Sequence, residues 1–116
     1  MPLEPEGNFL KTVLVTDADD ETLITADLGD VLLVELEENP TTGYRWELTE
    51  KGDLPLVTSG FTPPADTAPG AGGLRRFSFD ADTAVEHRLI FRLQRAWERP
   101  DQFIKSFKVI VRVRDN

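Results

Sequence analysis

The sequence contains no cysteine, which excludes disulfide bonds and thiol chemistry. It has one histidine, His87, so a Ser-His-Asp triad would have to use that single ring. His87 stands between Glu86 and Arg88 at the start of an alternating segment, where we expect a solvated, structural histidine. No apolar run approaches the ~20 residues of a membrane span. The N-terminus lacks a basic start followed by an apolar stretch, so no signal peptide is expected.

Two further segments resemble ligand sites only superficially. The acidic run DADDE (17–21) lacks the spaced oxygen ligands and central glycine of an EF-hand loop, so it predicts an acidic turn. The glycines of residues 70–73 are followed by no Lys-Ser/Thr pair, which a phosphate-binding loop requires. We therefore expect no enzyme activity, no metal and no cofactor.

Basic residues are scarce in the first half of the chain. The net charge of −8 divides into −11 for residues 1–58 and +3 for residues 59–116. Because affinity for nucleic acid depends on Lys and Arg contacts to phosphate, a nucleic-acid partner is not expected. The acidity itself indicates solubility, or steering toward a basic partner surface.

Period-two alternation of apolar and polar residues dominates, and no convincing helical repeat is present. Trp46 and Leu48 alternate with polar neighbours, as do Phe77 and Phe79. The last segment places Phe103, Phe107, Val109, Val111 and Val113 on one face. Such alternation predicts half-buried antiparallel strands. The expected strands are residues 9–16, 30–37, 44–49, 54–61, 73–80, 86–95 and 103–114, with a short extra strand at 22–26.

Seven to eight short strands separated by turn-rich segments predict one all-β domain of 116 residues, an immunoglobulin-like antiparallel β-sandwich. We expect Trp46 to be its core tryptophan and residues 1–8 to form a flexible tail. Because successive antiparallel strands reverse direction, alternate loops emerge at the same end. The segments ENPTTG (38–43), TPPADTAPGAGG (62–73) and RAWERPDQ (95–102) are therefore expected at one end, where scaffolds commonly carry sites.

Each of these three loops has an unusual composition. Pro40 stiffens the first loop and restricts Asn39, while β-branched Thr41 and Thr42 have few rotamers to lose on binding. Gly43 permits a positive φ before Tyr44. The alternative is that this loop is only a rigid structural turn.

The other two loops also have two readings. The small residues Gly70, Ala71, Gly72 and Gly73 allow close approach to a partner's backbone, or simply form a loose connector. Arg95 and Trp97 are residue types that anchor interfaces, unless Trp97 folds back onto the sandwich. Together the three loops form a stiff tip, a backbone strip and an aromatic anchor, which suits insertion into a cleft.

The motifs NPTTGY, GAGG and RAW, in this order and spacing, resemble those of the chagasin-like inhibitors of papain-type cysteine proteases. That family's pattern is NPTTG with an aromatic residue, then G-x-G-G, then R-P-W. The resemblance extends from about residue 28 to 113. It implies an immunoglobulin-like fold in which residues 39–44 enter the protease cleft. It also implies that residues 70–73 lie on the non-primed side and that Arg95 and Trp97 grip the primed side. Ala96 departs from the pattern, because the family usually has proline there.

The sequence therefore predicts a reversible, competitive inhibitor of papain-like cysteine proteases, acting as a monomer without membrane or nucleic-acid partners. The alternative is an immunoglobulin-like binding or assembly module that uses the same loops on a non-protease partner. Localisation stays open: a cytoplasmic protein is expected if the chain is complete, and a periplasmic or secreted one if an export signal was removed.

Overall fold

In a computed structural model, described for residues 11–63, 72–99 and 101–115, the protein consists of strands and two short 3₁₀ helices. The elements in chain order are β1 (Thr12–Thr16), η1 (Asp17–Asp19), β2 (Thr22–Asp27), β3 (Val31–Glu38), η2 (Pro40–Thr42), β4 (Tyr44–Glu50), β5 (Leu56–Thr62), β6 (Gly73–Asp80), β7 (Glu86–Arg95) and β8 (Lys105–Arg114). Each strand agrees with an expected one to within three residues at either end. The predicted tail, residues 1–8, lies outside the described residues.

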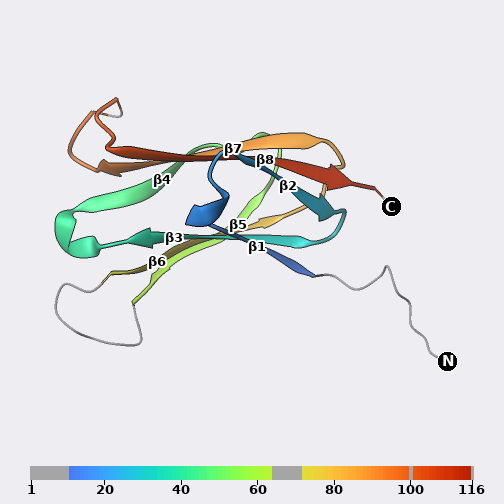
Figure 1. Ribbon diagram of the computed structural model, residues 1–116, viewed down its shortest axis with the longest axis horizontal. Helices are drawn as coiled ribbons and strands as arrows, with labels where there is room; N and C mark the ends of the chain where they lie inside the picture. The colour runs from blue at the N-terminus through green and yellow to red at the C-terminus, as the bar shows by residue number, and fades with distance from the viewer. Residues whose placement is uncertain (1–10, 64–71, 100, 116) are drawn as a thin grey trace.

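The strands form two four-stranded sheets that pack face to face (Figure 1). One sheet has the order β1-β3-β6-β5 and the other β2-β8-β7-β4. This arrangement confirms the predicted all-β sandwich. Two pairings differ from the antiparallel expectation, because β1 runs parallel to β3 and β2 runs parallel to β8. Both are edge strands whose partners are not joined to them by a hairpin, so no tight turn fixes their direction.

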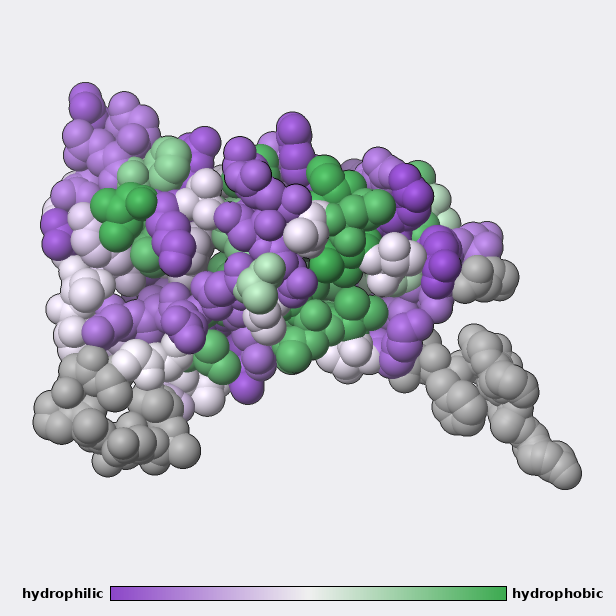
Figure 2. Space-filling model, in the orientation of Figure 1, coloured by the Kyte–Doolittle hydropathy of each residue, from purple (hydrophilic) through white to green (hydrophobic). Residues whose placement is uncertain are grey.

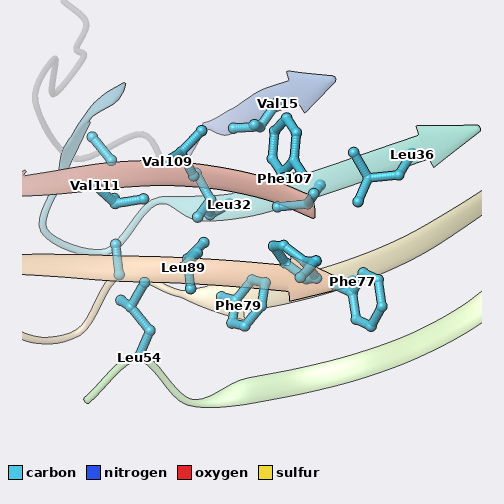
Figure 3. Packing of buried hydrophobic residues seen from close by; sticks show 14 of the residues in the cluster. Val15, Leu32, Leu36, Leu54, Phe77, Phe79, Leu89, Phe107, Val109 and Val111 are labelled. Carbon is cyan, nitrogen blue, oxygen red and sulfur yellow. The ribbon is translucent and has the colours of Figure 1, made fainter. Parts of the chain in front are cut away.

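The inward-facing residues of both sheets form one hydrophobic core (Figure 3). Phe91 lies at its centre, with ring centroids 4.8 Å from Phe77, 6.4 Å from Phe79 and 6.0 Å from Phe107. Trp46 is 2% exposed, so the prediction of a core tryptophan is confirmed. Phe103, expected on the same face as Phe107, is instead 37% exposed, because β8 begins only after it.

His87 is buried, so the prediction of a solvated histidine is wrong. It occupies the inward phase of β7, two residues before Leu89. Its Nδ1 accepts a hydrogen bond from the Asp53 N–H (3.3 Å), and its Nε2 lies 3.1 Å from the Thr83 carbonyl oxygen. These partners assign the proton to Nε2. His87 therefore ties two turns together and is structural, as expected, although it is not solvated.

The acidic run 17–21 is a turn whose carboxylates bind backbone N–H groups. Asp17 accepts from the Glu37 N–H (3.1 Å), Asp19 from that of Thr16 (2.9 Å) and Asp20 from that of Lys108 (2.9 Å). Among the described residues no group of three or more His, Cys, Asp or Glu side chains is arranged to hold a metal. In the same residues no helix has the length and apolarity needed to cross a membrane.

The strand directions place three connections at one end of the sandwich, on the left in Figure 1. There β3 passes into β4, β5 ends and β6 begins, and β7 turns back into β8. The turns after β2, β4 and β6 lie at the opposite end. The grouping of the three unusual loops that strand parity predicts is therefore confirmed for their described parts.

Candidate functional site

Loop 39–43 crosses from one sheet to the other and is held by its own side chains. Asn39 begins η2, and its Oδ1 accepts hydrogen bonds from the N–H (3.1 Å) and hydroxyl (2.8 Å) of Thr41. The Thr42 hydroxyl donates to the Asn39 carbonyl oxygen (2.8 Å) and accepts from the Tyr44 N–H (3.2 Å). Pro40 is the first helical residue, where proline costs no hydrogen bond. Both threonines thus stiffen the loop, while its tip stays largely open to solvent.

Gly43 ends η2 in the left-handed conformation, with φ of 81° and ψ of −6°. Its N–H donates to the Pro40 carbonyl oxygen (3.2 Å). A residue with a Cβ adopts this conformation only at an energetic cost. The positive φ expected at this position is therefore confirmed, and it turns the chain directly into β4.

Trp97 joins the first loop to the third. An ideal Cβ placed on Gly43 would lie 2.8 Å from Cη2 of Trp97, so the indole is in direct contact with the first loop. The rest of the side chain faces solvent, since Trp97 is 72% exposed. Trp97 therefore rests on the first loop by one edge and presents most of its surface outward.

Arg95 lies between two aromatic rings. Its guanidinium carbon is 4.2 Å from the ring centroid of Tyr44 and 5.7 Å from that of Trp97. Stacking of this kind orients a guanidinium. Nη1 is 3.6 Å from a carboxylate oxygen of Glu98, and Nε is buried with no hydrogen-bond partner among the described residues. Arg95 thus contributes to the site chiefly by fixing Tyr44 and Trp97 relative to each other.

The third loop starts with a tight turn over residues 95–98. The Glu98 N–H donates to the Arg95 carbonyl oxygen (3.2 Å), which places Ala96 and Trp97 at the two central positions. Further along, the Ile104 N–H donates to the Leu93 carbonyl oxygen (2.9 Å) and starts the return into β8. The turn therefore holds Trp97 out from the sheet even though Ala96 replaces the family's proline.

The second segment begins where β5 ends and runs into β6. Gly73 pairs with Glu38 across β3 and β6, and a Cβ on Gly73 would overlap the Thr62 carbonyl oxygen and lie 2.7 Å from the Phe61 ring. A Cβ on the exposed Gly72 would lie 3.5 Å from the Glu38 carbonyl oxygen. Both glycines therefore lie beside the stem of the first loop, which consists of Glu37 and Glu38 at the end of β3 and residues 44–46 at the start of β4. Gly70 and Ala71 lie outside the described residues.

A groove of about 560 Å³ opens between these segments. Thr42, Tyr44, Gly72, Arg95 and Ile104 are among its lining residues, so all three predicted loops contribute to one concavity. Among the described residues between β7 and β8, the exposed large apolar ones are Trp97, Phe103 and Ile104. Figure 2 shows apolar surface among polar side chains at this end. Ile104, which lines the groove, was not predicted as a site residue because the alternation pattern assigns it to the last strand.

Comparison with known proteins adds an independent line of evidence. Residues 25–111 match the family described as Chagasin family peptidase inhibitor I42. The chain belongs to this family. The matched region contains all three loops, and membership confirms the resemblance drawn from NPTTGY, GAGG and RAW. A chagasin-family chain is a cysteine protease inhibitor and not an enzyme, as the lack of a catalytic constellation in the sequence had led us to expect.

Individual relatives extend over nearly the whole chain. Chagasin of Trypanosoma cruzi is 26% identical over 104 residues, which cover 84% of this chain and 94% of that protein. The cysteine protease inhibitor EhICP2 of Entamoeba histolytica superposes with a TM-score of 0.81 at 18% identity, over 90% of this chain and 97% of that one. PbICP-C, solved in complex with falcipain-2, has a TM-score of 0.56 at 16% identity, over 91% and 99%. At these identities the structural matches establish the shared fold.

Proposed function

We propose that this chagasin-family chain is a reversible, competitive inhibitor of papain-like cysteine proteases that fills the active-site cleft with three loops. The single observation that carries the proposal is the contact between Trp97 and Gly43. It joins the third loop to the first, while Gly72 lies against the stem of the first loop. The three segments therefore form one continuous surface, as a plug for a single cleft requires.

The first loop, Asn39 to Tyr44, is the part that enters the cleft. Hydrogen bonds from both threonine side chains are made within the loop, so insertion requires little further ordering. Interfaces gain affinity when the bound conformation already exists in the free protein. We therefore expect tight binding from this short loop without a large contact area.

The flanking segments bind on either side. The strip Gly70 to Gly73 lies along the non-primed side of the cleft, where small residues allow main-chain contacts. Arg95 and Trp97 bind on the primed side, and Trp97 is the apolar anchor because most of its surface is unburied in the free protein. The protein acts as a monomeric single domain over residues 1–116 and needs no metal or cofactor.

Inhibition assays test this proposal. Titration into papain and a cathepsin L-type enzyme, with a fluorogenic substrate, should raise the apparent KM and leave kcat unchanged. Activity should return on dilution, and mass spectrometry should recover the inhibitor uncleaved. The absence of inhibition at micromolar concentration across several such enzymes would overturn the proposal in favour of the binding-module alternative.

A further inference from the structure

A buried ion pair lies beneath the first loop. Glu38, the last residue of β3, has a side chain only 1% exposed, and its carboxylate binds the Arg75 guanidinium of β6. Arg75 Nη2 donates to Oε2 at 2.6 Å, and Nε lies 3.1 Å and 3.2 Å from the two oxygens. The Arg75 side chain is 16% exposed and lies over the Phe61 ring, 5.2 Å from its centroid. Such a two-pronged pair has a defined geometry.

The same carboxylate reaches the opposite sheet. Glu38 Oε1 accepts a hydrogen bond from the Trp46 N–H of β4 (2.8 Å), and the Trp46 indole N–H donates to the Glu37 carbonyl oxygen (2.9 Å). The two ends of the loop stem are therefore fastened to each other by two hydrogen bonds. Because Gly73 pairs with Glu38 and Gly72 lies beside it, the pair also fixes the start of the second segment.

Stability alone explains such a pair poorly. Removing two charges from water costs energy that their attraction only partly returns, and apolar replacements of a buried pair are often neutral or stabilising. The hydrogen bond from the Trp46 N–H is different, because it needs an acceptor on β3 and an apolar pair provides none. The effect that distinguishes Glu38 and Arg75 from an apolar pair is therefore on the position of the loop.

We propose that Glu38 and Arg75 are positioning residues that fix the stem of loop 39–43 relative to Gly72 and Gly73, and so set inhibitory affinity without contacting the protease. The part concerning affinity rests on the proposed function. The part concerning loop position concerns the free protein and is measured without any protease.

The chain offers a matched control on the same two strands. Glu35 and Arg76 are paired in register across β3 and β6, and their side chains form an ion pair of 2.7 Å. The Arg76 side chain is 45% exposed, and this pair lies on the outer face of the sheet, away from the loop stem. Changes to Glu35 and Arg76 thus reproduce the charge changes without touching the loop.

The first measurement is amide hydrogen exchange by NMR on the full-length protein alone. In Glu38→Leu/Arg75→Leu, the N–H groups of Thr42, Gly43 and Tyr44 should exchange about tenfold faster, because their loop hydrogen bonds open more often. Glu35→Leu/Arg76→Leu should change these rates less than about twofold. Glu38→Gln, which preserves side-chain shape, should shift the rates in the same direction and serves if the double variant does not fold. Unchanged exchange in the folded Glu38 variants would overturn the proposal.

The second measurement is the inhibition constant against papain. Glu38→Leu/Arg75→Leu should weaken inhibition by about tenfold, mainly through faster dissociation, as expected when preorganisation is lost. Its unfolding midpoint should stay close to that of the control pair, which separates loop position from global stability. Faster exchange with an unchanged inhibition constant would overturn the link to affinity. A wild-type protein that inhibits no protease would overturn the proposed function instead, while the exchange rates still decide the positioning role.

Discussion

Trp97 packs against Gly43, although the two residues lie on different loops that are far apart in the sequence. The gap between them is so small that a Cβ on Gly43 would come within 2.8 Å of the indole. Gly43 therefore leaves free the space beside the Trp97 indole that a Cβ would fill. A tryptophan that is 72% exposed is held in place by a residue that has no side chain.

Replacing Gly43 with alanine is expected to disturb the site in two ways, by straining the backbone and by displacing Trp97. The φ of 81° costs a residue with a Cβ about 1–2 kcal/mol, and the added methyl group displaces Trp97. Chemical denaturation should show a stability loss of about that size. The inhibition constant against papain should rise by about tenfold or more, because the loop tip and the indole no longer form one surface.

Gly52→Ala is the matched control for Gly43→Ala. Gly52 also has a positive φ, of 60°, but its Cβ would point toward the His87 ring at the other end of the sandwich. We expect a comparable stability loss with an unchanged inhibition constant. Equal effects of both variants on inhibition would show that Gly43 acts through global stability alone.

Trp97→Ala should weaken binding with little effect on folding. The side chain is mostly exposed in the free protein, so its removal costs little internal packing. Truncation of an anchor tryptophan costs about 2 kcal/mol or more at an interface, or about a 30-fold higher inhibition constant. Leu23→Ala is the control, because Leu23 is an apolar residue of β2 that is 51% exposed outside the loops. An unchanged inhibition constant for Trp97→Ala would remove Trp97 from the interface.

Much of the fold could be predicted from period-two alternation. Phe77, Phe79, Leu89 and Phe91 all face the core as their spacing predicted, because a one-residue shift would expose the whole set. Strand parity then placed the three loops at one end. The parallel pairing of β1 with β3 and of β2 with β8 could not be predicted, since neither β1 nor β2 is joined to its partner by a local turn that signals the direction.

The ion pair of Glu38 and Arg75 beneath the first loop was not predicted, although both residues left a signal in the sequence. Glu38 continues the inward phase of β3, which buries every second residue from 32 to 36. Arg75 is likewise in phase with the buried Phe77 on β6. Two opposite charges at inward positions of two strands indicate a buried pair, but the register that brings them together is visible only in the structure. The burial of His87 was not predicted for a related reason. Its charged neighbours Glu86 and Arg88 indicate an exposed position, whereas its place in the alternation of β7 is inward.

Acid should remove the contribution of Asp27 to stability. The Asp27 carboxylate accepts a hydrogen bond from Lys11 Nζ (2.8 Å) and another from Arg114 Nη2 (2.9 Å). The bond from Lys11, more than that from Arg114, lowers the pKa of Asp27 against an opposing effect of burial. A lowered folded-state pKa stabilises the protein above the unfolded pKa of about 3.9, and this stabilisation is lost as the pH falls through the folded value.

The difference in unfolding midpoint between wild type and Asp27→Asn should therefore be largest near neutral pH and shrink toward zero in acid. Thermal unfolding followed by circular dichroism from about pH 7 to about pH 2 measures it. In a Lys11→Met background the difference should be smaller, because the main cause of the lowered pKa is gone. A difference that stayed constant down to about pH 2 would contradict this assignment.

Ala96→Pro should strengthen inhibition. Ala96 is the first central position of the turn closed by the Glu98 N–H, where proline is favoured, and no hydrogen bond from the Ala96 N–H is found among the described residues. The preceding residue, Arg95, ends strand β7, and an extended conformation is what proline requires of its predecessor. Proline at a compatible site raises the free energy of unfolding by about 0.4–1 kcal/mol, because it restricts the unfolded chain. In the folded protein, a stiffer turn also holds Trp97 in place. We expect a higher unfolding midpoint and an inhibition constant about two- to fivefold lower.

Ala96→Gly is the control, because it loosens the same turn. It should lower the unfolding midpoint and raise the inhibition constant. Weaker inhibition by Ala96→Pro would instead show that Trp97 has to move when the protein binds its target.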